Sequence, residues 1–336
     1  MRIALDAMGG DKAPAAMTAG ALDYALSQPD HTVVLVGPVG EVEQALTAAL
    51  NGRPRPSNIE LHDAPDVISM SEKIQALKDK PNDGMNRCAR LVKDGEADAM
   101  VLCGNTGCSV AAAQLHLRRI RGVKRAGILT PLPTVTGTCW VIDCGANASG
   151  KPEHLAQFGE MAASFLNSYD NRPDAKVGLL NIGSEDDKGH ELIGDTFKLL
   201  KDSDLNFVGN IEGNDIFTGE IDVVVCDGFT GNVVLKTAEG VAQALTQIIR
   251  EEARRSPWRM LGGLLMKGAF GGLRRRTHWS EVGGCLLLGV NGVTVIGHGR
   301  SDARAITNAL RQAERCVSTK VIEKLTAHLS AAADAA

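Results

Sequence analysis

The chain has 336 residues, a formal net charge of −4 and eight scattered cysteines; 44% of its residues are apolar but only 4% are aromatic. This length can bury a large core, in one long α/β domain or in two lobes. The negative charge argues against a nucleic-acid binder, whose surface would be basic. The cysteines include no C-x-x-C pair, so we expect reduced core residues of a cytoplasmic protein and no metal site.

Strands and helices alternate from the first residues onward, without the long apolar core of a signal peptide and without a run that could span a bilayer. Successive β–α units imply right-handed crossovers and a mostly parallel sheet. The predicted strands are Arg2–Asp6, Thr32–Gly37, Ile59–Ala64, Ala97–Cys103, Thr138–Asp143, Lys176–Asn181, Val223–Val225 and Val293–Ile296. The predicted helices are Pro14–Leu26, Val42–Leu50, one within Asp66–Asp79, Asn86–Asp94, Cys108–Arg118, Glu153–Asn167, His190–Leu200, Val233–Ala244, Gly240–Arg255 and Ala303–Leu325. We expect one domain over residues 1–330 and a frayed tail at 331–336.

Five turns that follow predicted strands are rich in glycine, asparagine, threonine and aspartate. They read GGD (9–11), GNTG (104–107), DCGAN (143–147), NIGSEDDKG (181–189) and DGFTGN (227–232). Ligands bind outside the carboxyl ends of parallel strands, so we expect these turns to form a polar cleft at one edge of the sheet. Their N–H groups would suit phosphate or a developing oxyanion.

The stretch Ile221–Lys236 shows this device most clearly. A buried valine strand ends at Asp227-Gly228, a turn follows, and a helix is predicted from Val233. The amides and small polar side chains at Thr230–Asn232 would hold an anion, although an ordinary capped turn has the same sequence pattern.

Side chains in and near these turns offer charge and hydrogen bonds. Lys188 could neutralise a phosphate or be a solvated turn lysine, and His298 is the strongest histidine candidate because it lies in a Gly-His-Gly turn after a strand. The strand-end aspartates could bind a substrate hydroxyl or accept a proton, but helix capping is their commoner role. The residues that we expect to bind substrates are Asp6, Gly9, Gly10, Asp11, Asn105, Thr106, Gly107, Asp143, Asn147, Asp227, Thr230, Gly231 and His298.

Several common sites lack their motifs. The chain has no G-x-G-x-x-G in the first turn, no P-loop, no G-x-S-x-G elbow and no H-E-x-x-H. A small anion therefore fits the cleft better than a nucleotide.

The segment Ser256–Arg276 differs in kind from the rest. If it is helical, Trp258, Leu261, Leu265 and Leu273 lie on one face, while Lys267 lies opposite. Basic residues flank the segment, and five glycines make it a poor helix in water. This pattern is typical of a segment that lies on an anionic membrane surface; the alternative is a helix packed on a dimer partner or on the core.

Together, these motifs resemble those of the bacterial phosphate acyltransferase (PlsX) family of phospholipid synthesis. The matching stretches run in one collinear order from the first strand to the last helix. They are ALDAMGGD (4–11), GNTG (104–107), DCGAN (143–147), KPEHL (151–155), LNIGSEDDKG (180–189), VCDGFTGNVVLKTAEG (225–240), Gly283–Cys285 and His298-Gly299. The chain departs from the family pattern at Asp83-Gly84-Met85, Cys108-Ser109 and Arg125-Ala126-Gly127.

The resemblance implies a three-layer α/β/α sandwich, Rossmann-like and similar to isopropylmalate dehydrogenases and phosphotransacetylases. It implies transfer of a long-chain acyl group from acyl carrier protein to inorganic phosphate without a cofactor, with Lys188 and Asn232 as catalytic residues. It also implies a cytoplasmic homodimer, peripherally associated with the inner face of the plasma membrane, where a membrane-bound glycerol-3-phosphate acyltransferase takes the acyl phosphate.

An acidic carrier protein would favour a basic docking patch. The candidates are Arg118, Arg119, Arg121, Lys124 and Arg125, which could equally be a solvated helix end. Two rival functions are a dehydrogenase, which requires a dinucleotide, and a non-catalytic scaffold at the membrane surface.

Overall fold

The computed structural model describes residues 1–277 and 279–335. Its strands form one sheet with the spatial order β3-β2-β1-β4-β11-β10-β5-β6-β9-β7-β8. The strands are β1 (Arg2–Asp6), β2 (Thr32–Gly37), β3 (Ile59–Asp63), β4 (Ala99–Leu102), β5 (Gly127–Pro133), β6 (Thr138–Ile142), β7 (Val177–Leu180), β8 (Phe207–Ile211), β9 (Val223–Val225), β10 (Gly284–Leu288) and β11 (Val293–Gly297).

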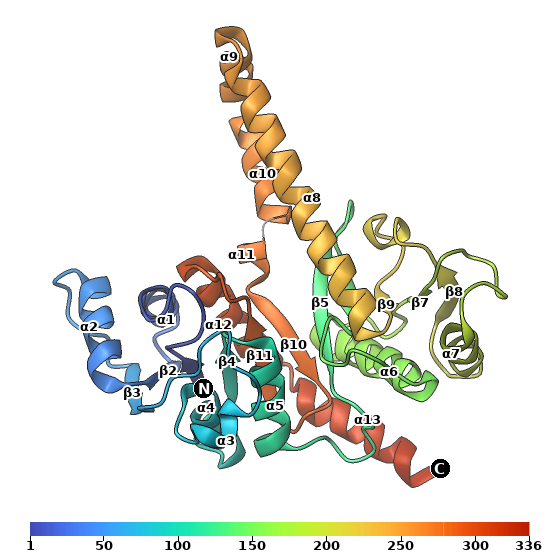
Figure 1. The fold of residues 1–336 in the computed structure, drawn as a ribbon, viewed down its shortest axis with the longest axis horizontal. Coiled ribbons are helices and arrows are strands. Elements are labelled where there is room, and N and C mark those ends of the chain that lie inside the picture. Colours follow the sequence, from blue (N-terminus) through green and yellow to red (C-terminus); the bar gives the residue numbers. More distant parts are fainter. Residues whose placement is uncertain (278, 336) are drawn as a thin grey trace.

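Helices cover both faces of this sheet (Figure 1). They are α1 (Ala15–Ser27), α2 (Val39–Leu50), α3 (Ala76–Asp79), α4 (Gly84–Lys93), α5 (Thr106–Leu117), α6 (Pro152–Tyr169), α7 (Glu191–Lys201), α8 (Gly228–Arg254), α9 (Pro257–Leu265), α10 (Lys267–Thr277), α11 (Trp279–Val282), α12 (Ala303–Ser318) and α13 (Val321–Ala335), with a short 3-10 turn at Asp215–Phe217.

The sheet separates two apolar cores. On β1, Ile3 and Leu5 point into the core beneath α1, α2, α6, α7, α12 and α13, whereas Ala4 points into the core beneath α4 and α5. This alternation follows from the period of two in a strand. Because both faces are covered, the strands read as continuous apolar runs. The expected three-layer α/β/α architecture is therefore confirmed.

Two antiparallel strands in the middle divide the sheet into blocks. β1, β2, β3, β4 and β11 are mutually parallel and form the first block; β6, β9, β7 and β8 form the second. Between them, β10 is antiparallel to both β11 and β5, and β5 is antiparallel to β6. The two blocks therefore run in opposite directions, so the expectation that all the polar turns share one sheet edge is wrong.

Some element boundaries differ from the expected ones for local reasons. β5 is not among the predicted strands, because it contains Pro131 and Pro133, residues that argue against a strand inside a sheet. Residues 66–75 form an irregular loop, with only the four-residue α3 after it. The last helix is two, α12 and α13, because the chain turns at Lys320 with a positive φ of 55°.

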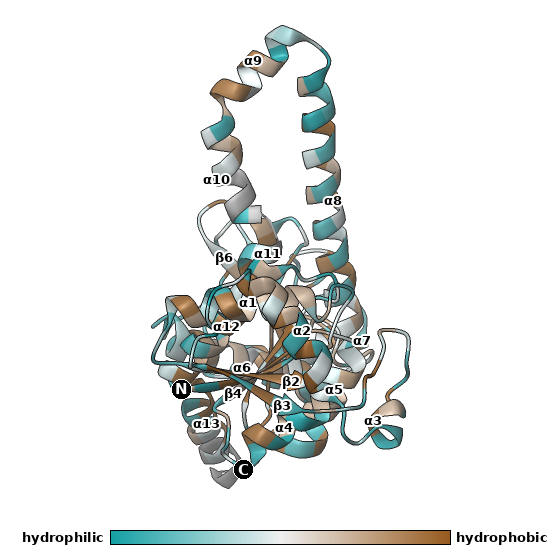
Figure 2. Ribbon diagram, turned by 90° about the vertical axis from the view of Figure 1, so that its left-hand side faces the viewer, coloured by the Kyte–Doolittle hydropathy of each residue, from teal (hydrophilic) through white to brown (hydrophobic). Residues whose placement is uncertain are grey.

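The helix α8 projects from the body and returns through α9 and α10 as a long hairpin (Figure 1). The segment Ser256–Arg276 is thus two helices that meet at Met266. Trp258 and Leu265 are 82% and 80% exposed, and Leu261 is also exposed; the side chain of Leu273 lies outside the described residues. Figure 2 shows apolar residues of α9 at the far end of the hairpin. No helix among the described residues is long and apolar enough to cross a membrane.

Candidate functional site

Helix α8 begins five residues earlier than expected, at Gly228. Its N-cap is Asp227, whose Oδ1 accepts hydrogen bonds of 3.0 Å from the amides of Phe229 and Thr230, while Oδ2 accepts one of 2.6 Å from Thr230 Oγ1. An Asp that satisfies the first N–H groups is a strong helix start. Helix capping, the commoner role expected of the strand-end aspartates, is therefore confirmed for Asp227, and the amides of Phe229 and Thr230 are not open to phosphate.

The first turn of α8 packs against the turn that follows β6. A Cβ atom added at Gly231 would lie 2.0 Å from the carbonyl oxygen of Asp143, and one at Gly228 would lie 2.3 Å from that of Asn147. Only glycine permits this approach. Gly231 therefore serves helix packing, and its expected contact with substrate gains no support.

Asp143 organises the turn after β6 from a fully buried position. Its Oδ1 accepts from the amides of Ile128, Gly145 and Ala146 at 2.9–3.0 Å, and its Oδ2 accepts from the backbone amide and the side chain of Asn147 at 2.8 and 2.9 Å. The pKa of Asp143 stays raised, because the effect of burial exceeds that of these donors, which lower it. With its lone pairs engaged, this carboxylate shapes the site and does not reach substrate.

Asn232 lies one turn into α8 and is exposed. It faces the Asp143 turn: a Cβ atom added at Gly145 would lie 3.6 Å from Asn232 Cβ and 3.7 Å from its Oδ1. Its amide makes no hydrogen bond to any described residue. Asn232 can therefore donate to a ligand without giving up an internal bond.

Lys188 lies in the turn after β7, the neighbour of β9. Asn181 folds this turn, because its Nδ2 donates to the Lys188 carbonyl at 2.9 Å and its Oδ1 accepts from the Ile182 amide at 2.8 Å. The Lys188 side chain is exposed and forms no ion pair with a described residue. Lys188 and Asn232 follow neighbouring parallel strands, although no contact joins them.

The turns of the first block pack tightly on one another. A Cβ atom at Gly9 would lie 2.2 Å from the Cys103 carbonyl oxygen, and Gly10, with φ +91°, lies against Gly299. The Asp11 amide donates to the Gly299 carbonyl at 2.7 Å. These contacts bring together the turns that follow β1, β4 and β11, as the sequence predicts.

Asp6 lies beneath these turns, where its Oδ1 accepts from the Met8 amide at 3.1 Å. Burial raises the pKa of Asp6 to about 7, and the nearby Asp83 adds to the shift. Asp83, one of the departures from the family pattern, caps α4 by accepting from the amides of Met85 and Asn86. Neither carboxylate is exposed to a ligand.

Asn105 caps α5 with its Oδ1, which accepts from the Cys108 amide at 3.1 Å. Its Nδ2 donates to the carbonyls of Met70 and Glu72 at 3.1 and 2.8 Å. Both N–H bonds are thus used to hold the 66–75 loop, so Asn105 is poorly placed to donate to an oxyanion. The amides of the exposed Thr106 and Gly107 make no hydrogen bond to a described residue and are open to an anion.

The helix α8 joins the two blocks at His298. Lys236 Nζ lies 2.9 Å from His298 Nε2, and Glu239 Oε2 lies 2.9 Å from Arg300 and 3.2 Å from Lys236. Burial and then Lys236 lower the pKa of His298, which agrees with a neutral imidazole that accepts from the ammonium. One helix therefore touches both groups of turns.

Lys236, Glu239 and Arg300 were absent from the expected site. Asn232, Lys236 and Glu239 are spaced i, i+4 and i+7, so they share one face of α8. That signal becomes visible only when the helix starts at Gly228. The side chains of Asn232 and Lys236 can each donate to an anion or to a carbonyl oxygen that gains negative charge.

Comparisons with known proteins identify the family. Residues 1–324 match the family model described as "Fatty acid synthesis protein". The chain is 44% identical over 331 residues to the phosphate acyltransferase of Desulfitobacterium hafniense, covering 98% of both chains, and 43% identical over 337 residues to that of Dictyoglomus thermophilum, covering 99% of both.

Solved structures show the same fold at low identity. A phosphotransacetylase from Streptococcus pyogenes superposes with a TM-score of 0.63 at 16% identity, over 96% of this chain and 94% of that one. A 4-hydroxythreonine-4-phosphate dehydrogenase from Klebsiella pneumoniae superposes with a TM-score of 0.57 at 13% identity, over 94% and 99%. The family model and the curated relatives together show that the chain belongs to the fatty acid synthesis protein family and, with its relatives, to the phosphate acyltransferases.

Proposed function

We propose that the enzyme transfers a long-chain acyl group from acyl carrier protein to inorganic phosphate, giving acyl phosphate and free carrier protein in the first steps of phospholipid (phosphatidic acid) biosynthesis. The observation that carries the proposal is the face of α8 that presents Asn232 and Lys236 between the two blocks, with the exposed Lys188 in the turn after β7, the strand beside β9. This face supplies the ammonium group of Lys236 and the unused side-chain amide of Asn232, and it contains no covalent nucleophile.

In this mechanism phosphate is held by lysine ammonium groups and by the open amides of Thr106 and Gly107. A phosphate oxygen attacks the thioester carbonyl, and Asn232 donates to the tetrahedral oxyanion, a contribution of about 3 kcal/mol. The thiolate leaves as the carbonyl re-forms. Because a thiolate is a good leaving group, the reaction needs no acyl-enzyme, and orientation of the two substrates supplies much of the rate.

The test measures free-thiol release from acyl carrier protein, with and without phosphate. We expect Lys188→Ala and Asn232→Ala each to lower turnover by about 100-fold, whereas Lys198→Ala, which removes an exposed lysine from α7, should keep it. Wild-type activity in both variants would refute the assignment. Release without phosphate would indicate a thioesterase instead, and binding of NAD(P) would favour the dehydrogenase.

We further propose that the hairpin tip lies on an anionic membrane surface in the cytoplasm, at the inner face of the plasma membrane. The exposed Trp258, Leu261 and Leu265 would enter the interface, flanked by basic residues. Acyl phosphate would then pass to a membrane-bound glycerol-3-phosphate acyltransferase. Trp258→Ala combined with Leu265→Ala should abolish cosedimentation with anionic vesicles and preserve thiol release; unchanged cosedimentation would favour the dimer alternative.

A homodimer is proposed from the sides of the hairpin. Val241, Leu245 and Ile248 are exposed at spacings of four and three residues on α8, so they form an apolar stripe that a second copy would cover. Leu245→Glu should give a monomer in analytical ultracentrifugation. A wild-type monomer under the same conditions would contradict the dimer.

A further inference from the structure

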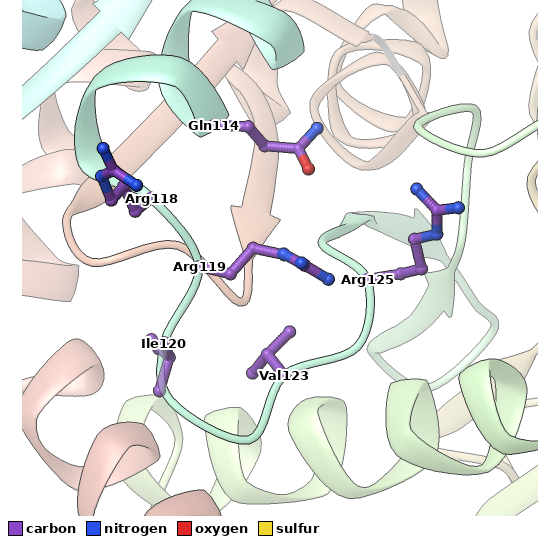
Figure 3. A pocket seen from close by; sticks show the side chains of 6 residues that line it. All are labelled: Gln114, Arg118, Arg119, Ile120, Val123 and Arg125. Carbon is purple, nitrogen blue, oxygen red and sulfur yellow. The ribbon is translucent and has the colours of Figure 1, made fainter.

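A cavity of about 510 Å³ lies beside the loop between α5 and β5 (Figure 3). Its lining contains three arginines and no carboxylate: Gln114, Arg118, Arg119, Ile120, Val123 and Arg125. Figure 3 shows the Arg119 side chain extending toward Arg125, with the Gln114 amide on the same side, whereas Arg118 lies apart. Two guanidinium groups and an amide therefore border one space.

The surrounding structure holds this loop in place on two sides. Asn291, in the β10–β11 turn, donates from Nδ2 to the carbonyls of Leu117 and Arg119 at 3.2 and 2.9 Å. On the other side, Gln157 of α6 accepts from the Lys124 amide at 2.7 Å and donates to the Gly122 carbonyl at 3.0 Å. The arginines are therefore carried by an ordered backbone and need little further ordering to bind.

The charge around the cavity is positive and not compensated locally. Within residues 1–277 and 279–335, no carboxylate forms an ion pair with Arg119 or Arg125. Arg119 donates one hydrogen bond to the Lys124 carbonyl, which leaves most of its five N–H groups available. The pKa of His154 is lowered by burial and, against the pull of Glu153, by Arg125 and two lysines.

The loop that carries the arginines contacts the site described above. The carbonyl of Ala126, the residue after Arg125, accepts from Asn147 Nδ2 at 2.7 Å, and Asn147 belongs to the turn that faces Asn232. The backbone that carries Arg125 is thus anchored to the Asp143 turn one residue further along the chain.

We propose that Arg119, Arg125 and Gln114 bind a phosphate group of a substrate. Planar guanidinium groups pair with phosphate oxygens in bidentate fashion. On the proposed function, on which this inference rests, two sources exist: inorganic phosphate, and the phosphodiester of the carrier protein's phosphopantetheine arm. A cavity of this size, with apolar Ile120 and Val123 beside the arginines, has room for the aliphatic part of the arm.

Calorimetric titration of the full chain with 4′-phosphopantetheine and with pantetheine, which lacks the phosphate, tests the pocket without catalysis. If the pocket binds the phosphopantetheine arm, the wild type should bind the phosphorylated compound about tenfold more tightly than pantetheine. Arg119→Ala and Arg125→Ala should each remove that preference. Arg125→Lys should recover only part of it, and Lys198→Ala should leave it intact.

Thiol-release kinetics of the same variants separate the two sources. A KM for acyl carrier protein that rises about tenfold, with an unchanged KM for phosphate, assigns the pocket to the arm. A rise in the KM for phosphate alone assigns it to inorganic phosphate. Wild-type values of both constants, together with no phosphate preference in the titration, would overturn the proposal. A wild-type enzyme that releases no thiol would instead refute the proposed function, while the titration still judges the pocket.

Discussion

Two buried aspartates after strands, Asp143 and Asp6, have different surroundings. Five N–H groups donate to the Asp143 carboxylate, so they offset part of the rise in its pKa that burial causes. Asp6 accepts from one amide and lies near Asp83, so its ionised form is disfavoured. Sequence position alone does not distinguish them, because Asp6 ends one strand and Asp143 comes directly after another.

Asp6 should make folding stability depend on pH. Its pKa rises from 3.8 to about 7 on folding, so the folded state binds the extra proton and the wild type loses stability as pH rises from about 4 to 7. Asp6→Asn removes this loss. The free energy of unfolding of the variant should therefore rise with pH relative to that of the wild type. At about 1.4 kcal/mol per unit of pKa shift, the difference should reach up to a few kcal/mol at pH 8.

Urea unfolding midpoints at pH 5, 6, 7 and 8 measure this gain. Asp30→Asn changes an exposed aspartate and should track the wild type throughout. Parallel curves for Asp6→Asn and wild type would show that Asp6 is ionised in the folded protein.

The sequence predicts the residue types of the site better than their tasks. Lys188 and Asn232 are exposed and unengaged as a ligand contact requires, but their catalytic roles stay predictions. Asn105 and Asp227 have side chains that could bind a ligand, but the side-chain oxygens of both accept from backbone amides as helix caps. Whether such a side chain binds a ligand or caps a helix depends on which backbone amides folding brings near it. A single sequence does not specify the distances to those amides.

At the scale of elements, the cap at Asp227 explains why helix α8 begins earlier than the sequence predicts. Its glycines at 228 and 231 suggest a turn because glycine is a poor helix former. The Asp227 cap and close packing on the Asp143 turn outweigh that preference. Strand β5 was missed for a related reason, since Pro131 and Pro133 are tolerated there against local expectation.

Removing the Asp227 cap should destabilise the protein measurably. Asp227→Ala leaves the amides of Phe229 and Thr230 without an acceptor, at a cost of about 1 kcal/mol or somewhat more. Asp227→Asn keeps a side-chain oxygen and should cost less. Chemical denaturation of the two variants compares these values, and equal stability of Asp227→Ala and wild type would rule out a cap that matters for folding.

At the scale of the whole molecule, the strands of the two blocks run in opposite directions, and helix α8 connects the turns of one block to those of the other. Alternation of strands and helices predicts the layers, but it does not reveal where β10 and β11 insert. That insertion depends on pairing between residues far apart in the chain, and no local pattern encodes it. The cluster of Lys236, Glu239, His298 and Arg300 is the resulting contact between blocks.

Glu239 is the acid that holds this cluster together, with a side chain 16% exposed. Glu239→Gln removes the carboxylate that Lys236 and Arg300 share. We expect a loss of about 1–2 kcal/mol, because the partners are partly exposed. Hydrogen exchange should quicken in the turn at 298–301 and stay unchanged in β8.

Glu251→Gln provides the matched control for this experiment. It changes an exposed glutamate on the same helix, in the projecting hairpin. Equal exchange at 298–301 in both variants would mean that the ion pairs do not restrain the contact between blocks.

The late position of β11 in the chain also bears on synthesis by the ribosome. β4 ends at Leu102, but its neighbour β11 spans Val293–Gly297. A nascent chain thus carries an unpaired strand edge through most of translation, and such edges promote aggregation. Chaperones that shield this edge should raise the yield of native enzyme, and truncations before residue 297 should be insoluble.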